Sequence, residues 1–170
     1  MQMGRTCRLA IIRSAVSIKR EFPSQPVVGV GGVVIRENKA LLIRRAAEPL
    51  KGQWSIPGGA LELGETLLEG VRRELREETG LDVLVLDLIE VFERIMHDPP
   101  EANAGRPDPR YHFVIVDYLC EAPHGEPVAG SDVTDLAWAG EEHLAQYNLT
   151  PTATRILRKA FALARAAASA

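Results

Sequence analysis

The sequence predicts an α/β (α+β) fold organised as a single domain, and three observations support this. At 170 residues the chain is long enough for one domain with a proper core and short for two. Several short apolar segments have the pattern of strands, and they lie before and after a helix with clear start and stop signals. A second helix near the carboxyl end carries one apolar face, which we expect to pack on the sheet.

The composition excludes several classes of protein. Charged residues make up 25% of the chain and hydrophobic residues 46%, which is the ordinary balance of a globular protein. The net charge of −3 gives no bias towards nucleic acid, and no apolar run is long enough to span a membrane. Cys7 and Cys120 form neither a CxxC pair nor a disulfide framework. We therefore expect a cytoplasmic protein without a nucleic-acid or membrane partner.

The first residues differ in composition from the rest. Residues 1–23 mix basic and apolar side chains, with no acidic residue before Glu21. An organellar transit peptide has this composition too, but an N-terminal extension is the favoured interpretation. Because prolines then interrupt regular structure, we expect residues 1–24 to be an extension and residues 25–168 to form the single domain.

A β-hairpin is predicted next, with strands over 27–35 and 40–45 and a polar turn between them. Three glycines, Gly29, Gly31 and Gly32, lie within the first strand. A dinucleotide-binding loop would need a helix directly after these glycines, and a second strand follows instead. We expect the glycines to permit close approach of another part of the chain.

The hairpin leads into a loop over 46–55 that has basic residues at its start and within it. Arg44, Arg45 and Lys51 have the charge needed to hold phosphate groups, but ordinary charged surfaces show the same pattern, and both interpretations stay open. Trp54 has the chemistry to stack on a base, although a buried anchor is the favoured role.

Helix signals bound the residues between Thr66 and Gly80. Thr66 is placed to cap the helix, with Glu69 as its capping-box partner three residues later. Gly80 stands where a left-handed residue ends a helix. On a helical wheel Leu68, Val71 and Leu75 share the side that we expect to face a core.

Three acids on this helix are neighbours. Glu74, Glu77 and Glu78 are spaced by three and four residues, so their like charges repel, and they lie near the negative end of the helix dipole. A bound divalent cation would reverse both penalties, because hard cations take carboxylate oxygens as ligands. Glu69, Arg73 and Glu77 also form the charge ladder of a solvated helix face. Spacing alone does not decide between the two interpretations.

The rest of the chain alternates between strands, loops and short helices. A long loop over 96–110 is rich in Pro and Gly, and loops of this kind are often functional. The strand over 111–120 is apolar on both faces, so we expect it to be central in the sheet. The other predicted elements are strands over 81–88, 89–95 and 136–138, a short helix over 141–146, and a final helix that begins at Thr150-Pro151.

The stretch from 59 to 81 has a further pattern: Gly, five residues, Glu, seven residues, then Arg-Glu-apolar-any-Glu-Glu-any-Gly-apolar. Its members here are Gly59, Glu65, Arg73, Glu74, Leu75, Glu77, Glu78, Gly80 and Leu81. This stretch resembles the signature of the Nudix hydrolases without a departure. The resemblance implies an α/β/α sandwich, with a mixed β-sheet between helices, and the hydrolysis of a pyrophosphate bond with the help of Mg²⁺ or Mn²⁺.

The resemblance also implies roles for individual residues. Metal ligands would be the carboxylates of Glu74, Glu77 and Glu78 and the carbonyl of Gly58, the residue before the first glycine of the signature. An ion pair between Glu65 and Arg73 would fix the loop and orient the acids. Gly59 and Gly80 would be structural.

One further acid is expected in the loop over 122–135, where many family members place a metal ligand or general base. Asp132 matches best, with Glu126 and Asp135 behind it. Other members carry a glutamate here, so Asp132 is a departure. The resemblance leaves Glu74 and Asp132 open as the general base.

The implied substrate is a nucleoside diphosphate linked to another group. The flanking segments look most like bacterial ADP-ribose pyrophosphatases, which suggests cleavage of ADP-ribose to AMP and ribose 5-phosphate. Pro99 and Pro100 lie near the place where that subgroup carries a proline. A nucleoside triphosphate pyrophosphohydrolase is the first alternative, and a Nudix-fold sensor domain that binds a nucleotide without cleaving it is the second. Many family members are homodimers.

Overall fold

The computed structural model describes residues 20–48, 50–98 and 108–169. Most of the expected N-terminal extension, together with Pro99 and Pro100, therefore lies outside the described residues. Within the described ranges, no helix is long and apolar enough to cross a membrane.

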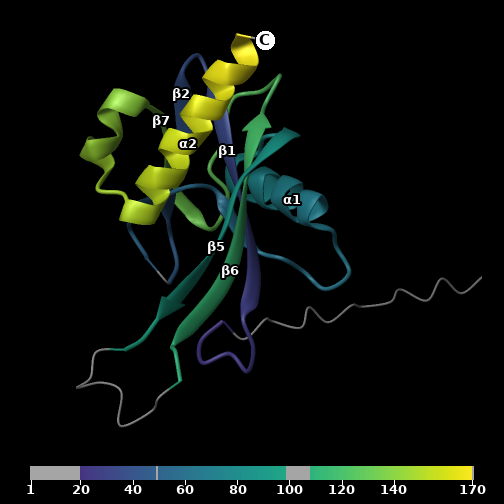
Figure 1. Ribbon diagram of the computed structural model, residues 1–170, viewed down its shortest axis with the longest axis vertical. Coiled ribbons are helices and arrows are strands. Elements are labelled where there is room, and N and C mark those ends of the chain that lie inside the picture. Colours follow the sequence, from purple (N-terminus) through teal and green to yellow (C-terminus); the bar gives the residue numbers. More distant parts are fainter. Residues whose placement is uncertain (1–19, 49, 99–107, 170) are drawn as a thin grey trace, which may run out of the picture.

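A mixed sheet of seven strands forms the centre of the molecule (Figure 1). Its main path runs in the order β3-β2-β1-β6-β5, while β4 pairs with β1 and β7 pairs with β2. The sheet is mixed because β1 and β6 are parallel and the other pairs are antiparallel. The strands are β1 (Val27–Arg36), β2 (Lys39–Arg45), β3 (Trp54–Ser55), β4 (Gly58–Ala60), β5 (Leu84–Met96), β6 (Tyr111–Glu121) and β7 (Val133–Gly140).

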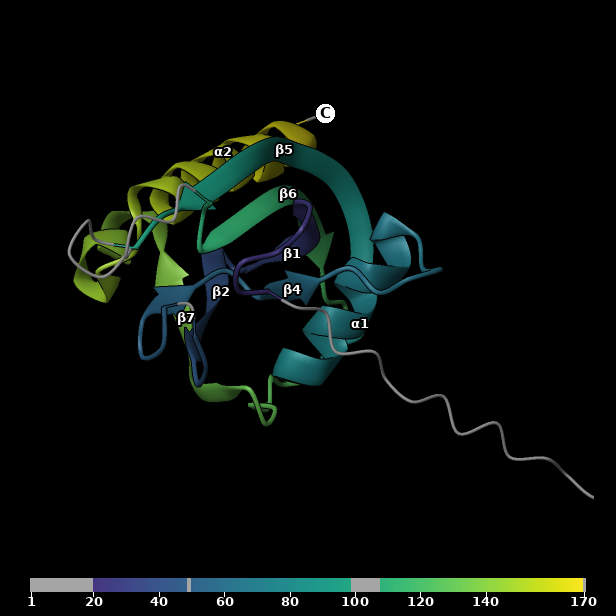
Figure 2. The ribbon, with the colours of Figure 1, turned by 90° about the horizontal axis from the view of Figure 1, so that it is seen from below.

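Two α-helices lie on opposite sides of these strands, as Figure 2 shows. On one side, α1 (Leu67–Thr79) packs Val71 and Leu75 against β1 and β2. On the other, α2 (Pro151–Ala168) packs Ile156 and Leu157 against the opposite face, together with the 3₁₀-helix η1 (Glu141–Tyr147). The expected α/β/α sandwich is confirmed.

The predicted hairpin and central strand are confirmed. β1 and β2 are antiparallel around a turn in which Glu37 and Asn38 have φ of +49° and +59°, the pair of left-handed residues that a tight hairpin turn needs. β6 lies between β1 and β5 in the sheet. Trp54 packs edge-to-face with Tyr147 beside the α2-side core, as expected of an anchor.

Two other segments differ from expectation. The residues from 84 to 96 form one strand, β5, which is kinked by two irregularities in its pairing with β6 rather than divided into two strands. The loop after β2 and the turn that follows it contain two very short strands, β3 and β4. Their two and three residues are too few for any periodicity to show.

The helix signals are confirmed at both ends of α1, but one assigned face is wrong. Thr66 and Glu69 form the capping box, and Gly80 ends the helix in the left-handed conformation with φ of +69°. Val71 and Leu75 are buried, whereas Leu68 is 42% exposed and Leu67 packs against the core in its place. The buried face is rotated towards Glu74 and Glu78, so the core extends further round the helix than the leucines alone indicated.

The contrast between Leu68 and Leu75 gives a test of this packing. Leu75→Ala removes a fully buried side chain, so we expect the free energy of unfolding to fall by about 2–5 kcal/mol. Leu68→Ala is expected to cost less than about 1 kcal/mol, because Leu68 is 42% exposed and buries far less apolar surface than Leu75. Urea unfolding of both variants measures the two changes, and a loss at Leu68 as large as that at Leu75 would contradict the assigned faces.

Candidate active site

Gly58 and Gly59 begin β4, directly after the short connection from β3, and this pair forms a glycine turn that lies against α1. β4 pairs with β1, which places Gly58 opposite Gly31 and Gly59 opposite Val30. A Cβ atom on Gly59 would lie 2.5 Å from both carboxylate oxygens of Glu74. Only glycine at this position leaves room for the Glu74 carboxylate to lie against the turn.

The three acids of α1 occupy different environments. Glu74 and Glu78 lie one helical turn apart and are only 9% and 6% exposed, whereas the side chain of Glu77 is 59% exposed. Glu78 Oε2 accepts a hydrogen bond from the backbone N–H of Gly58 at 2.7 Å. The structure therefore joins Glu74, Glu78 and Gly58 in one small region and leaves Glu77 at its edge.

Burial disfavours the charged forms of the two inner carboxyls. It raises the pKa of Glu78 to about 7, although the Gly58 N–H and the charge of Arg45 act in the opposite direction. The charges of Glu74 and Asp132 raise the pKa of Glu78 further. Burial also raises the pKa of Glu74, partly offset by Arg73. A positive ion beside these carboxylates would relieve this cost.

Arg73 connects the acids to the loop before the helix. Its guanidinium donates to both carboxylate oxygens of Glu65, at 2.7 and 3.1 Å, and to the carbonyl of Ala60 at 3.0 Å. Its other Nη atom donates to Glu74 at 2.8 Å and to Glu77 at 3.1 Å. One side chain thus sets the positions of three acids and of the loop that follows the glycine turn.

The loop that carries Asp132 packs on the carboxyl end of α1. The N–H of Gly130 donates to the backbone carbonyl of Glu78 at 3.0 Å. The exposed Asp132 lies near enough for its charge to act on the Glu78 carboxyl. The structure therefore brings the loop of Asp132 to the carboxyl end of α1, within electrostatic reach of Glu78. Glu126 pairs instead with Arg36 at 3.5 Å, and Asp135 lies opposite Arg44 in the sheet.

The basic residues expected to bind phosphate separate into two groups. Arg45 points towards the glycine turn, and its Nη1 lies 3.5 Å from the carbonyl oxygen of Gly58. Arg44, its neighbour along the strand, is exposed and donates to the carbonyl of Gly52 at 2.9 Å. Lys51 lines a separate shallow hollow beside Glu48. Only Arg45 of the three lines the cavity next to the motif.

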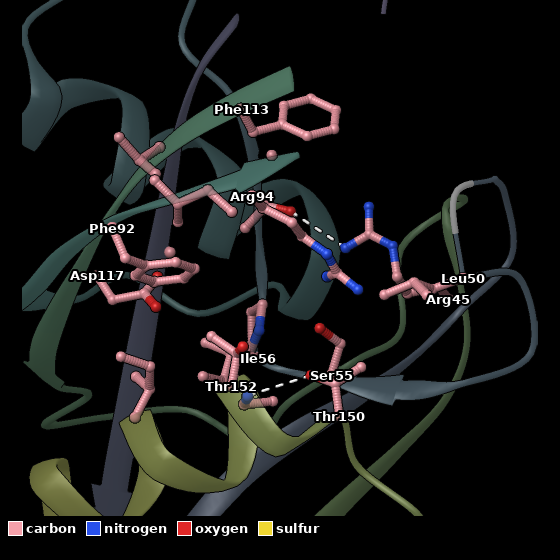
Figure 3. Close-up of a pocket in the computed structure, with 18 of the residues that line it drawn as sticks. Arg45, Leu50, Ser55, Ile56, Phe92, Arg94, Phe113, Asp117, Thr150 and Thr152 are labelled. Atoms are coloured by element: carbon pink, nitrogen blue, oxygen red, sulfur yellow. Dashed lines mark hydrogen bonds between the residues drawn. The ribbon is translucent and has the colours of Figure 1, made fainter. Parts of the chain in front are cut away.

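Arg94 joins Arg45 at this cavity, although the sequence analysis did not single it out (Figure 3). Burial, and then the nearby charge of Arg45, lower the pKa of Arg94. Neither arginine forms an ion pair with another described residue. The only sequence signal was that Arg94 follows Phe92 at the spacing of one strand face.

The cavity has a volume of about 140 Å³ and lies between the sheet and the first turn of α2. Gly58 and Gly59 form part of its rim, so it adjoins the region of Glu74 and Glu78. Its other walls combine apolar and polar side chains, among them Phe92, Phe113, Ile115, Asp117, Thr152 and Ile156.

The acids fit a hard divalent cation by their chemistry. Buried carboxylates and a backbone carbonyl are the oxygen donors that such ions prefer. Within the described ranges, no group of three or more His, Cys, Asp or Glu is arranged as a ready metal site. Glu74 and Glu77 are both turned towards Arg73, and Glu78 towards the Gly58 N–H.

Known proteins resemble this chain in sequence and in structure. The NUDIX domain family model matches residues 25–160. An ADP-ribose pyrophosphatase of Methanocaldococcus jannaschii is 38% identical over 132 residues, which cover 78% of this chain and 72% of that protein. The nucleoside triphosphatase NudI of Escherichia coli K12 is 30% identical over 129 residues, which cover 74% of this chain and 90% of that protein.

The fold has a counterpart among solved structures. A crystal structure of a MutT NUDIX hydrolase from Burkholderia pseudomallei matches with a TM-score of 0.66 and 31% identity, covering 79% of this chain and 98% of the other. The region that the NUDIX family model matches, residues 25–160, includes Gly58, Gly59 and α1. The chain belongs to the Nudix hydrolase family.

Proposed function

We propose that this Nudix hydrolase is a Mg²⁺-dependent enzyme that cleaves ADP-ribose to AMP and ribose 5-phosphate. The observation that carries the proposal is the adjacency of the buried acids on α1 to the cavity, through Gly58 and Arg45. The similarity to a protein named ADP-ribose pyrophosphatase supports this substrate. We propose residues 25–168 as the catalytic domain and the cytoplasm as its location.

Glu74, Glu77, Glu78 and the carbonyl of Gly58 would hold the metal. When bound, such an ion neutralises charge on the phosphates and lowers the pKa of a coordinated water. Rotation of the Glu78 carboxylate away from the Gly58 N–H frees both of its oxygens. The rest of the reaction depends on the residues that orient the phosphates and accept the proton.

Two carboxylates have positions suited to accept a proton from the attacking water. Asp132 is exposed beside Glu78, and its carboxylate has no hydrogen-bond or ion-pair partner among the described residues. Glu74 is buried and held by Arg73. We propose Asp132 as the base, because water has direct access to it and its carboxylate keeps freedom to move.

Arg45 and Arg94 would bind the phosphate oxygens. Two guanidinium groups that lie together without an acidic partner among the described residues repel each other, and a diphosphate would remove that repulsion. Arg45 also lies beside the Gly58 carbonyl, so a diphosphate held there would reach the acids of α1.

A nucleoside triphosphate pyrophosphohydrolase is the second candidate, and the similarity to NudI favours it. The motif acids would act in the same way on that substrate. A sensor domain that binds a nucleotide without cleaving it is the third candidate. The complete set of motif acids argues against the sensor, and metal-dependent turnover separates it from both enzymes.

The first test is product analysis over a panel of ADP-ribose, NADH, diadenosine polyphosphates, sugar nucleotides, dGTP and 8-oxo-dGTP. With Mg²⁺ we expect AMP and ribose 5-phosphate from ADP-ribose, and no product after chelation. Pyrophosphate released from a triphosphate instead would support the second candidate. Binding of ADP-ribose without turnover would support the sensor.

Glu78→Gln should separate catalysis from stability. We expect turnover to fall by at least about 100-fold, because a metal ligand is lost. In chelator at pH 8 the melting temperature should rise, since the ionised form of Glu78 is disfavoured by burial and the amide carries no charge. Differential scanning calorimetry and product assays measure both effects, and an active variant would contradict the proposed site.

The two arginines Arg94 and Arg44 form a matched pair for the phosphate assignment. Arg94→Ala should raise KM for ADP-ribose by about 10-fold or more, because one charge-assisted contact with phosphate is worth roughly 1.5–3 kcal/mol. Arg44→Ala should leave KM within about twofold, since this side chain is bonded to the 46–55 loop outside the cavity. Equal effects of the two substitutions on KM in steady-state assays would contradict the assignment of Arg94 as a phosphate-binding residue.

A further inference from the structure

Asp117 is a buried acid in the wall of the cavity. It lies in the middle of β6, is only 4% exposed, and is bordered along the strand by apolar residues and Tyr118. Within the part of the chain that the structure describes, its carboxyl has neither a hydrogen-bond nor an ion-pair partner. No side-chain oxygen or nitrogen of the described residues is fully buried without a hydrogen-bond partner, so the Asp117 oxygens open onto the cavity, where a ligand can donate a hydrogen bond to them.

The backbone of β1 leaves room for this carboxyl. Gly31 lies opposite Asp117 in the parallel pairing of β1 with β6. A Cβ atom on Gly31 would collide with Oδ1 of Asp117, so the carboxyl occupies the space that the glycine leaves. Figure 3 shows Asp117 beside Phe92 in the cavity wall, away from the two arginines.

The charges nearest to Asp117 are already paired among themselves. Glu90 lies opposite Asp117 on β5 and forms ion pairs with Arg155 and Lys159 of α2. Burial, and then the charge of Glu90, raise the pKa of Asp117 to about 7, with Arg155 acting in the opposite direction. In either protonation state, the carboxyl keeps at least one oxygen that can accept a hydrogen bond.

The part of the cavity around Asp117 suits a flat, uncharged ring. Phe92, Phe113 and Ile156 contribute apolar walls. The volume of about 140 Å³ is close to that of an apolar protein cavity of roughly 150 Å³ that binds benzene. Arg45 and Arg94 lie at the side near Gly58. The lining therefore orients a nucleotide with its base beside Asp117 and its phosphates towards the arginines.

We propose that Asp117 determines base specificity by accepting a hydrogen bond from the exocyclic amino group of an adenine-type base. The inference deepens the proposed function and rests on its assignment of a nucleoside diphosphate substrate. A site built to bond an N–H group rejects an analogue without that group, because its own acceptor is then left unpaired. The expected discrimination is on the order of 10- to 100-fold for one hydrogen bond to a carboxyl.

The test compares ADP-ribose with its analogue in which purine replaces adenine, so that only the 6-amino group is missing. Wild-type enzyme should show a kcat/KM about 10- to 100-fold higher for ADP-ribose. Asp117→Leu should bring the ratio close to one by lowering kcat/KM for ADP-ribose alone. Asp117→Asn keeps an acceptor oxygen in the same place and should keep most of the preference.

Three outcomes would overturn the inference: no preference in wild type, a preference that survives in Asp117→Leu, or an equal loss on both substrates in that variant. The last would show a structural role. Should Asp117→Leu not fold, the comparison is repeated with Asp117→Ser, whose shorter side chain cannot reach the same position.

Calorimetric binding of AMP and of purine riboside 5′-monophosphate separates this inference from the proposed function. A preference for AMP that is lost in Asp117→Leu, with no hydrolysis of ADP-ribose, would support the role of Asp117 in base specificity and reject ADP-ribose as the substrate. Hydrolysis of ADP-ribose with equal binding of the two monophosphates would support ADP-ribose as the substrate and reject the role of Asp117 in base specificity.

Discussion

The guanidinium of Arg73 is the group on which the geometry of the site depends. It bonds at the same time to Glu65, to the carbonyl of Ala60 and to two acids of α1. Without this charge, Glu74 would be a buried carboxylate beside like charges at the negative end of a helix. Arg73 also bonds to Glu65 and to the carbonyl of Ala60 in the loop after β4. The same guanidinium therefore offsets the repulsion between the acids and keeps the glycine turn next to them.

Glycine provides the space for two carboxyls that the site needs. Glu74 lies against Gly59, and Asp117 lies against Gly31, in each case where a methyl group would collide with carboxyl oxygens. The two glycines lie on neighbouring strands, since β4 pairs with β1. The glycines of this small region thus set where both acids lie, one towards α1 and one towards the cavity.

Local signals in the sequence were sufficient for the hairpin, the capped helix and the central strand, because each depends on residues close together in the chain. Leu68 was misplaced because a helical wheel gives the relative positions of side chains but not which arc the sheet covers. The roles of Arg94 and Asp117 depend on strand pairing between residues far apart in the chain, 19 positions for Arg94 and Phe113 and 27 positions for Glu90 and Asp117. No spacing rule relates residues this far apart in the chain.

The polar groups of the site form three sets around Gly58 and the cavity. Carboxylates of α1 lie against Gly58 and Gly59, two arginines that have no acidic partner among the described residues lie beside Gly58, and the carboxyl of Asp117 lies further along the cavity. The proposed nucleoside diphosphate is complementary to this arrangement, with a hydrogen-bonding base at one end and, at the other, the negative phosphates with the pyrophosphate bond between them. Because each group is held by a different element, α1, β2, β5 or β6, the base contact can change without disturbing the acids. This separation gives a physical reason why one signature motif serves enzymes with different substrates.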